Sequence, residues 1–149
     1  GWNFRMTNLQ AAIGLAQLEQ LDKFILKKRE IGALYNEYLK DCSEIQLPVE
    51  ETEYAKNIYW VYGVVLKDEF PEDASSIMSK LGERKIGTRP FFYPMHKQPI
   101  FNQMGLFRED SHPNAERLAE RGFYVPSGLA LTKDEVRSVS EVLMQILAE

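Results

Sequence analysis

A long run of helical periodicity near the start of the chain restricts its fold more than any other feature. Apolar side chains recur at three- and four-residue steps over residues 9 to 39, which predicts one helix of roughly thirty residues. Thr7 and Gln10 stand at its start with the spacing of a capping box. Gly14 and Gly32 lie inside it, and each weakens an isolated helix by up to about 1 kcal/mol relative to alanine. Packing against other parts must therefore hold the helix.

A helix of this length carries more apolar surface than one small domain can cover. Large exposed apolar patches in soluble proteins are usually contact surfaces. We therefore expect part of the helix to meet another domain or another subunit, and we predict a homodimer. The alternative, in which the whole helix is buried on the sheet of its own domain, stays open at this point.

Short extended and helical patterns alternate in the rest of the chain, after a polar connection over residues 41–56. Strands are expected at residues 57–66, 86–93 and 123–127, and helices at residues 72–85, 113–121 and 132–147. Thr132 and Glu135 form a second capping-box pair at the start of the last helix. These patterns predict a small α+β domain, in which a short sheet is backed by helices on one face.

Composition excludes several classes of function. The chain has 149 residues with a formal net charge of −4 and no basic stripe, so nucleic acid is not an expected partner. Cys42 is the single cysteine and there are two histidines, so we expect neither an internal disulfide nor a structural zinc site. No apolar run is long enough for a bilayer, which makes the cytoplasm the expected location. The chain begins with Gly1 rather than methionine, which suggests a piece of a longer protein.

The stretch "TRPFFYPMHKQPIF", residues 88–101, concentrates aromatic and cationic side chains where no regular element can run. Pro90, Pro94 and Pro99 interrupt it, because proline fixes φ and has no N–H to donate. The stretch is either a shaped loop with aromatic walls and cationic ends, or a connection packed under the sheet. Its residues alone favour neither interpretation.

Seven polar residues are candidates for a site: Asn3, Arg5, Arg89, Tyr93, His96, Lys97 and Gln98. Asn3 and Arg5 precede the long helix, whose N-terminus favours anions, although capping and solvation explain such residues equally well. Arg89 stands beside aromatic residues, where a guanidinium can clamp a phosphate or pair with a carboxylate. Tyr93 and His96 follow in the same loop, and the histidine can carry a proton or donate a hydrogen bond. The runs "KKRE" and "ERLAER" are interpreted as solvated helix faces. Neither a glycine-rich phosphate loop nor a nucleophile elbow is present in the sequence.

The order of four segments carries the interpretation further. "GWNFRMTNLQAA", "NIYWVYGVVL", "IGTRPFFYPMHKQP" and "AERLAERGFYVPSGLALTKDEV" follow one another along the chain. Together they resemble the C-terminal part of DegT/StrS-type aminotransferases, over essentially the whole chain. These pyridoxal-phosphate (PLP) enzymes aminate keto groups on nucleotide-linked deoxysugars. The "TRPFFYPMH" loop is most similar to that of members acting on 4-keto-6-deoxyhexoses, perosamine synthases in particular.

The resemblance implies the small C-terminal domain of a fold-type I aminotransferase. Residues 1–40 would be a motif plus the long connecting and interface helix, residues 41–149 the α+β small domain, and the large PLP-binding domain would be absent. The position of Asn3 implies a contact across a dimer interface with the partner's PLP phosphate, and Arg5 is the next candidate for cofactor binding. The positions of Arg89, Tyr93 and His96 imply contacts with the sugar nucleotide.

The resemblance also implies what this chain lacks. The family's lysine that binds PLP covalently lies upstream of the "GWNFRM" position, and no lysine of this chain stands at a matching place. No catalytic residue is therefore assigned, and the chain alone should be inactive and should not bind PLP. No metal-binding residue is assigned either. In the intact enzyme glutamate is the expected amino donor, and polysaccharide biosynthesis the expected context. The alternative is a non-catalytic ligand-binding or dimerisation module derived from the same fold.

Overall fold

The helical segment at the start of the chain is divided in two in the computed structural model, which describes residues 2–107 and 109–149. Helix α1 spans Asn8–Leu18 and helix α2 spans Leu21–Leu39. Between them Gln20 leaves the helical region with φ −104° and ψ 1°, and its N–H donates to the carbonyl of Gln17 at 3.1 Å. This bond to the third preceding residue tightens the last turn of α1. The prediction of one unbroken helix is therefore wrong at this point.

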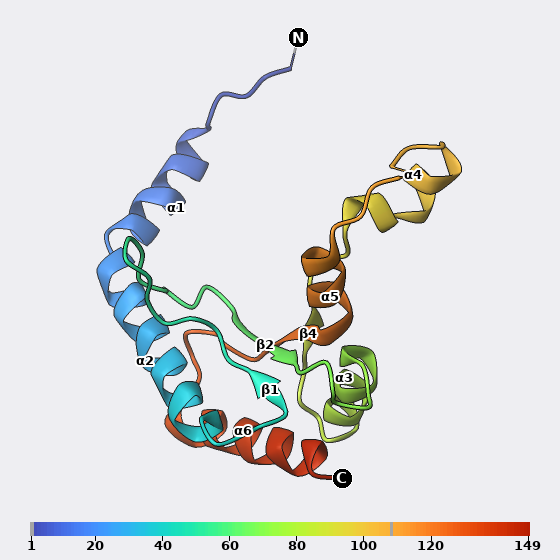
Figure 1. The fold of residues 1–149 in the computed structure, drawn as a ribbon. Helices are drawn as coiled ribbons and strands as arrows, with labels where there is room; N and C mark the ends of the chain where they lie inside the picture. The colour runs from blue at the N-terminus through green and yellow to red at the C-terminus, as the bar shows by residue number, and fades with distance from the viewer. Residues whose placement is uncertain (1, 108) are drawn as a thin grey trace.

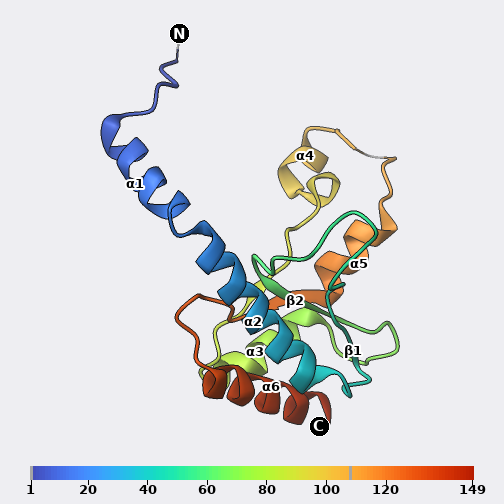
Figure 2. The ribbon, with the colours of Figure 1, turned by 90° about the vertical axis from the view of Figure 1, so that its left-hand side faces the viewer.

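Helix α1 projects away from the rest of the molecule (Figures 1 and 2). The predicted capping box of Thr7 and Gln10 is present at its start, and none of its residues is buried. Leu9 is 73% exposed and Ile13 is 59% exposed. The alternative of a helix wholly buried on its own domain is therefore wrong, and a contact of α1 with another domain or subunit stays a prediction.

A four-stranded antiparallel sheet lies at the centre of the fold. Its strands are β1 (Ile45–Gln46), β2 (Tyr62–Leu66), β3 (Arg89–Pro90) and β4 (Gly122–Val125), in the order β1-β2-β4-β3. Strand β2 begins later than predicted, because Tyr59 has a φ of 51° and its N–H donates to the Asn57 side chain at 2.7 Å. This local turn keeps residues 57–61 out of the sheet.

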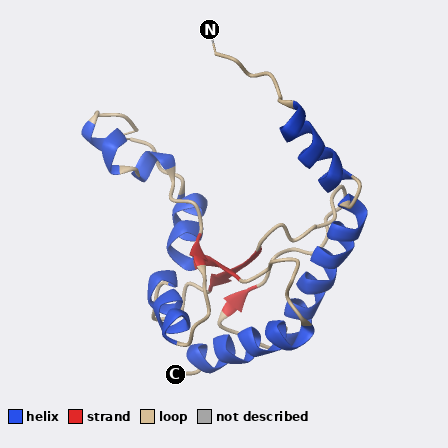
Figure 3. Ribbon diagram, turned by 180° about the vertical axis from the view of Figure 1, so that it is seen from behind, coloured by secondary structure: helices blue, strands red, loops and turns tan. Residues whose placement is uncertain are grey.

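Three helices cover one face of the sheet, as predicted (Figure 3). Besides α2 they are α3 (Ala74–Glu83) and α6 (Lys133–Leu147), and all three contribute buried apolar side chains to the core. The remaining helices are η1 (Met95–Lys97), α4 (Pro99–Gln103) and α5 (Pro113–Arg121), none of which contributes a side chain to this core. On the opposite face the Phe91 ring packs over Gly63 and Gly122, where an added Cβ would come within 2.8 Å and 2.5 Å of it.

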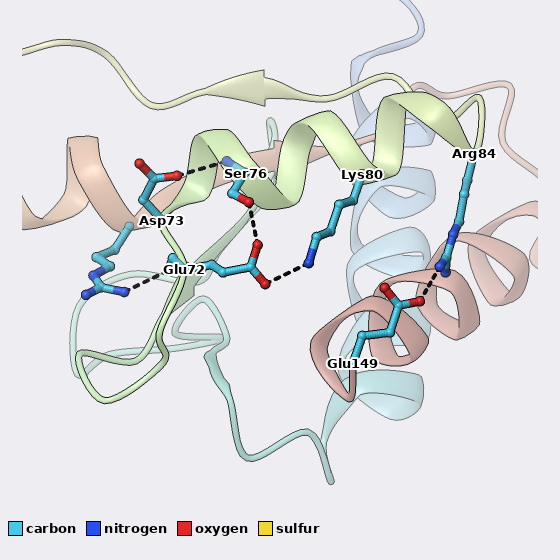
Figure 4. A network of polar contacts seen from close by, with 7 residues as sticks. Glu72, Asp73, Ser76, Lys80, Arg84 and Glu149 are labelled. Carbon is cyan, nitrogen blue, oxygen red and sulfur yellow. Dashed lines mark hydrogen bonds and ion pairs between the residues drawn. The ribbon is translucent and has the colours of Figure 1, made fainter.

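Polar contacts hold α3 beside the end of α6 (Figure 4). Asp73 caps the N-terminus of α3, and the Lys80 ammonium donates to Glu72 at 2.7 Å. Arg84, just past the last turn of α3, pairs with Glu149 at the end of the chain. Exposed pairs of this kind contribute at most about 1 kcal/mol each, so the apolar core supplies most of the stability. Within the described residues, no helix has the length and apolar content that a membrane crossing needs.

Gly32 of α2 lies directly against the chain that enters β2. A Cβ at Gly32 would lie 2.4 Å from ring carbons of Tyr59, whereas a Cβ at Gly14 would meet nothing within 4 Å. Gly14 and Gly32 look alike in the sequence, but their surroundings in the structure differ. Only Gly32 is required by packing.

We predict opposite effects for alanine at the two glycines. Gly32→Ala should lower the free energy of unfolding by about 1–3 kcal/mol, because the Tyr59 ring must move. Gly14→Ala, the matched control in the exposed helix, should not lower it, since alanine favours the helix by up to about 1 kcal/mol. Urea denaturation of the three proteins measures the difference, and equal stability of Gly32→Ala and wild type would contradict the packing argument.

Candidate functional site

The first two candidates lie on the extended segment before α1. Asn3 and Arg5 are both exposed, and the Asn3 side-chain oxygen accepts from the Arg5 N–H at 3.0 Å and from the Arg5 Nε at 3.2 Å. The pair thus presents amide and guanidinium donors beside the N-terminus of a helix, an arrangement that suits a phosphate. Gly1, the first residue of the predicted motif, lies outside the described residues.

Arg89 occupies strand β3 at the edge of the sheet, where it pairs with Tyr124 of β4. Its side chain is exposed and borders a surface pocket of about 230 Å³, together with Thr88 and Ser127. Among the described residues no carboxylate lies within ion-pair distance of it. The salt-bridge interpretation of Arg89 is therefore not supported, and its guanidinium is available to an anion.

The loop that follows β3 combines the two interpretations that the sequence left open. Phe91 and His96 are packed against the fold, while Phe92 and Tyr93 are 76% and 57% exposed. Tyr93 lines a second surface pocket, of about 300 Å³, with Lys97 and Glu116. The loop is therefore anchored by some of its side chains and presents the others to solvent.

His96 is held by a residue that the sequence analysis did not select. Its Nε2 lies 2.8 Å from the Oε1 of Glu116, and the imidazole is 8% exposed. The other carboxylate oxygen of Glu116 pairs with the Lys97 ammonium at 2.9 Å, and Oε1 also accepts from the His112 N–H at 3.2 Å. Glu116 had been placed on a solvated helix face, which is wrong. An acidic residue in the first turn of a helix was the one signal that pointed to it.

These bonds explain the electrostatics of the cluster. The Lys97 ammonium, followed by His96 and the His112 N–H, lowers the pKa of Glu116 to about 2. In turn, the carboxylate raises the pKa of Lys97. Hydrogen bonds to a carboxylate favour its ionised form, so Glu116 is charged throughout the neutral range.

The structure divides the five residues that the resemblance assigned to the site between two separate places. Asn3 and Arg5 precede α1, whereas Arg89, Tyr93 and His96 lie in β3 and in the segment that leads to α4, and Figure 1 shows α1 and α4 on two separate projecting parts of the molecule. Within the second group, Arg89 and Tyr93 border different pockets. The two groups do not form one site within this chain.

The lowered pKa of Glu116 predicts a specific loss of stability in acid. An unfolded glutamate has a pKa of about 4.3, so Glu116 stabilises the fold fully above that pH and less as the pH falls toward 2. The difference in unfolding free energy between wild type and Glu116→Gln should therefore shrink between about pH 4.5 and pH 2. Urea denaturation across this range measures it, with Glu120→Gln as control. A difference that stays constant with pH would contradict the bonded carboxylate.

Comparisons with known proteins agree with this fold and these motifs. The model of the DegT/DnrJ/EryC1/StrS aminotransferase family matches residues 1–144. The GDP-perosamine synthase of Escherichia coli O157:H7 is 34% identical over 149 residues, which is 100% of this chain and 38% of that protein. The chain thus spans well under half the length of this relative.

Two solved structures are similar along nearly the whole chain. Helicobacter pylori PseC, an aminotransferase involved in the biosynthesis of pseudoaminic acid, has a TM-score of 0.89 at 21% identity, covering 99% of this chain and 39% of PseC. At that identity the likeness shows the fold alone. DesI, solved in the presence of its TDP-sugar product, has a TM-score of 0.84 at 25% identity, covering 100% of this chain and 38% of DesI. With the family model matching nearly every residue, this chain belongs to the DegT/DnrJ/EryC1/StrS aminotransferase family.

Proposed function

We propose that this chain is the C-terminal part of a PLP-dependent aminotransferase. The intact enzyme would transfer an amino group from glutamate to a nucleotide-linked 4-keto-6-deoxysugar, for the synthesis of a surface polysaccharide. The match of the family model to residues 1–144 carries this proposal. The similarity to a GDP-perosamine synthase supports the choice of a deoxysugar substrate.

The exposed donors of the N-terminal arm suit the phosphate of PLP. In the proposal Asn3 and Arg5 bind this phosphate in a second copy of the protein, across the interface of a homodimer. The position of the arm, away from the β3 loop of the same chain, supports a site shared between subunits (Figure 2). When bound, PLP supplies the electron sink that amino transfer needs. The residues of this chain contribute binding and orientation.

The exposed Arg89 guanidinium suits the diphosphate of a sugar nucleotide. A guanidinium binds phosphate through two parallel hydrogen bonds, and Arg89 is free of carboxylate partners among the described residues. Tyr93 offers an exposed ring and hydroxyl from the same loop. His96, which is nearly buried where the loop meets α5, would also contact the sugar nucleotide. We assign these three residues to the substrate side of the site.

The exposed apolar surface of α1 favours a second candidate, a module that only dimerises or binds a ligand. The coding sequence upstream of Gly1 distinguishes the two proposals. An in-frame large domain containing the lysine for PLP is expected for the aminotransferase. A start codon at this position would support the module.

We expect this chain to associate at micromolar concentration through α1. Apolar side chains that the described residues leave largely exposed favour pairing, and Ile13 is 59% exposed. Sedimentation velocity should show a dimer or larger species for wild type, and Ile13→Glu should shift it toward monomer. Val49→Glu, at a site that is 63% exposed in another segment, is the matched control. A monomeric wild type would count against the interface.

Substitutions in the intact enzyme should separate the two groups of residues. Arg89→Ala and His96→Ala should lower kcat/KM for the sugar nucleotide by about ten- to hundredfold, the effect of losing one charge-assisted hydrogen bond. The half-reaction with glutamate should be nearly unchanged. Asn3→Ala should instead weaken PLP binding and slow both half-reactions.

Lys133→Ala, which removes an exposed charge from α6, controls for a general charge effect. If Arg89→Ala and His96→Ala lower only the melting temperature, the loop is a packed connection and its proposed role in substrate binding is refuted.

A further inference from the structure

The segment of residues 92–112, of which the structure describes all but residue 108, leaves the fold after β3 and returns at the start of α5. It carries η1 and α4 and forms the second projecting arm of the molecule (Figures 1 and 3). Several of its apolar side chains are exposed, including Phe92, Met95 and Ile100. A projecting segment of this length needs an anchor if it is to keep one orientation.

Glu116 is that anchor. The backbone bonds of the segment are local, such as Lys97 N–H to the Pro94 carbonyl and Gln98 N–H to the Met95 carbonyl. Among the described residues, every hydrogen bond between residues 92–112 and another part of the chain involves Glu116. Three of them end on its carboxylate, and the fourth runs from its own N–H to the His112 carbonyl at 3.0 Å.

The carboxylate joins the two ends of the projecting loop. His96 and Lys97 lie near the start of the loop and His112 is its last residue, and all three donate to Glu116. Bringing such ends together costs conformational entropy, which these charge-assisted bonds offset. A carboxylate accepts all three bonds at once, whereas a glutamine side chain would turn an N–H donor toward the Lys97 ammonium.

We infer that Glu116 is a positioning residue for nucleotide-sugar binding. It holds residues 92–112 in the orientation at which Tyr93 and its exposed neighbours meet the substrate, without touching that substrate. This inference rests on the proposed function for its substrate, but the anchoring contacts are independent of it.

The kinetic test uses the intact enzyme with Glu116→Ala, Glu116→Gln and the control Glu120→Ala. Glu120 lies one turn further along α5, is exposed, and makes no side-chain bond to the described residues. It lines the same surface pocket as Tyr93, so its removal controls for the loss of a nearby carboxylate that holds no part of the segment. Glu116→Ala should raise KM for the sugar nucleotide by about ten- to hundredfold, the range for lost charge-assisted bonds. Glu116→Gln should have a smaller effect, since its carbonyl oxygen still accepts from His96. The glutamate half-reaction and the control should stay within about twofold of wild type.

The second measurement needs only this chain. Amide hydrogen exchange of residues 92–112, and of the His112 N–H in particular, should be faster in Glu116→Ala than in wild type or Glu120→Ala. Exchange in β2 and β4 should not change, which separates lost anchoring from general unfolding. If Glu116→Ala does not fold, Glu116→Gln and Lys97→Met take its place in both measurements.

The outcomes distinguish the inference from the proposed function. A wild-type enzyme that is inactive on every nucleotide sugar refutes the proposed function, while faster exchange still establishes Glu116 as the anchor. An active wild type with Glu116 variants that match Glu120→Ala in KM and in exchange overturns the inference. Faster exchange with an unchanged KM also overturns it, because the anchor would then be structural only.

Discussion

Tyr35 of α2 stacks on Tyr62 of β2, with ring centroids 4.6 Å apart and an interplanar angle of 27°. Both rings are fully buried, and each hydroxyl has a partner. Tyr35 donates to the Pro126 carbonyl and Tyr62 to the Asn36 side chain, both at 2.7 Å. Burial raises the pKa of both phenols, so they remain neutral donors in the core. This contact fixes α2 on the sheet, and the turn at Gln20 then sets the direction of α1 relative to α2.

The two arms differ in how they are held. Helix α1 continues from α2 beyond the core, and it buries no side chain within the chain. The 92–112 segment is tied back to α5 by one carboxylate, and Phe91 at its base packs over Gly63 and Gly122. The sheet and its helices thus form the rigid part of the chain. The residues proposed to bind phosphate and sugar lie on the edge strand β3 and on the two projecting segments. Exposed donors in these positions suit ligands that another part of the intact protein or a second copy helps to enclose.

Several elements could be predicted because their signals are local. The capping boxes at Thr7 and Thr132 each involve a residue three positions away, and the structure contains both. The start of β2 was misjudged because the Asn57–Tyr59 turn overrides the β propensity of its aromatic residues. The break at Gln20 was missed because helical periodicity continues across it. Residue type alone indicates that Arg89 and Tyr93 are exposed polar candidates. It does not indicate that His96 is buried, because that burial depends on contacts made only in the folded chain.

The sequence by itself determined the α+β class, the segments that are mainly helical and, through its motifs, the family. Each depends on residue types at short or fixed spacing, which a single chain displays directly. Only the tertiary structure decided that Gly32 lies under Tyr59 and that Glu116 accepts from His96 and Lys97. His96 and Glu116 are 20 residues apart, and no local pattern links them. They meet because the antiparallel pairing of β3 with β4 brings the start of the loop back to α5, and this pairing depends on the whole fold.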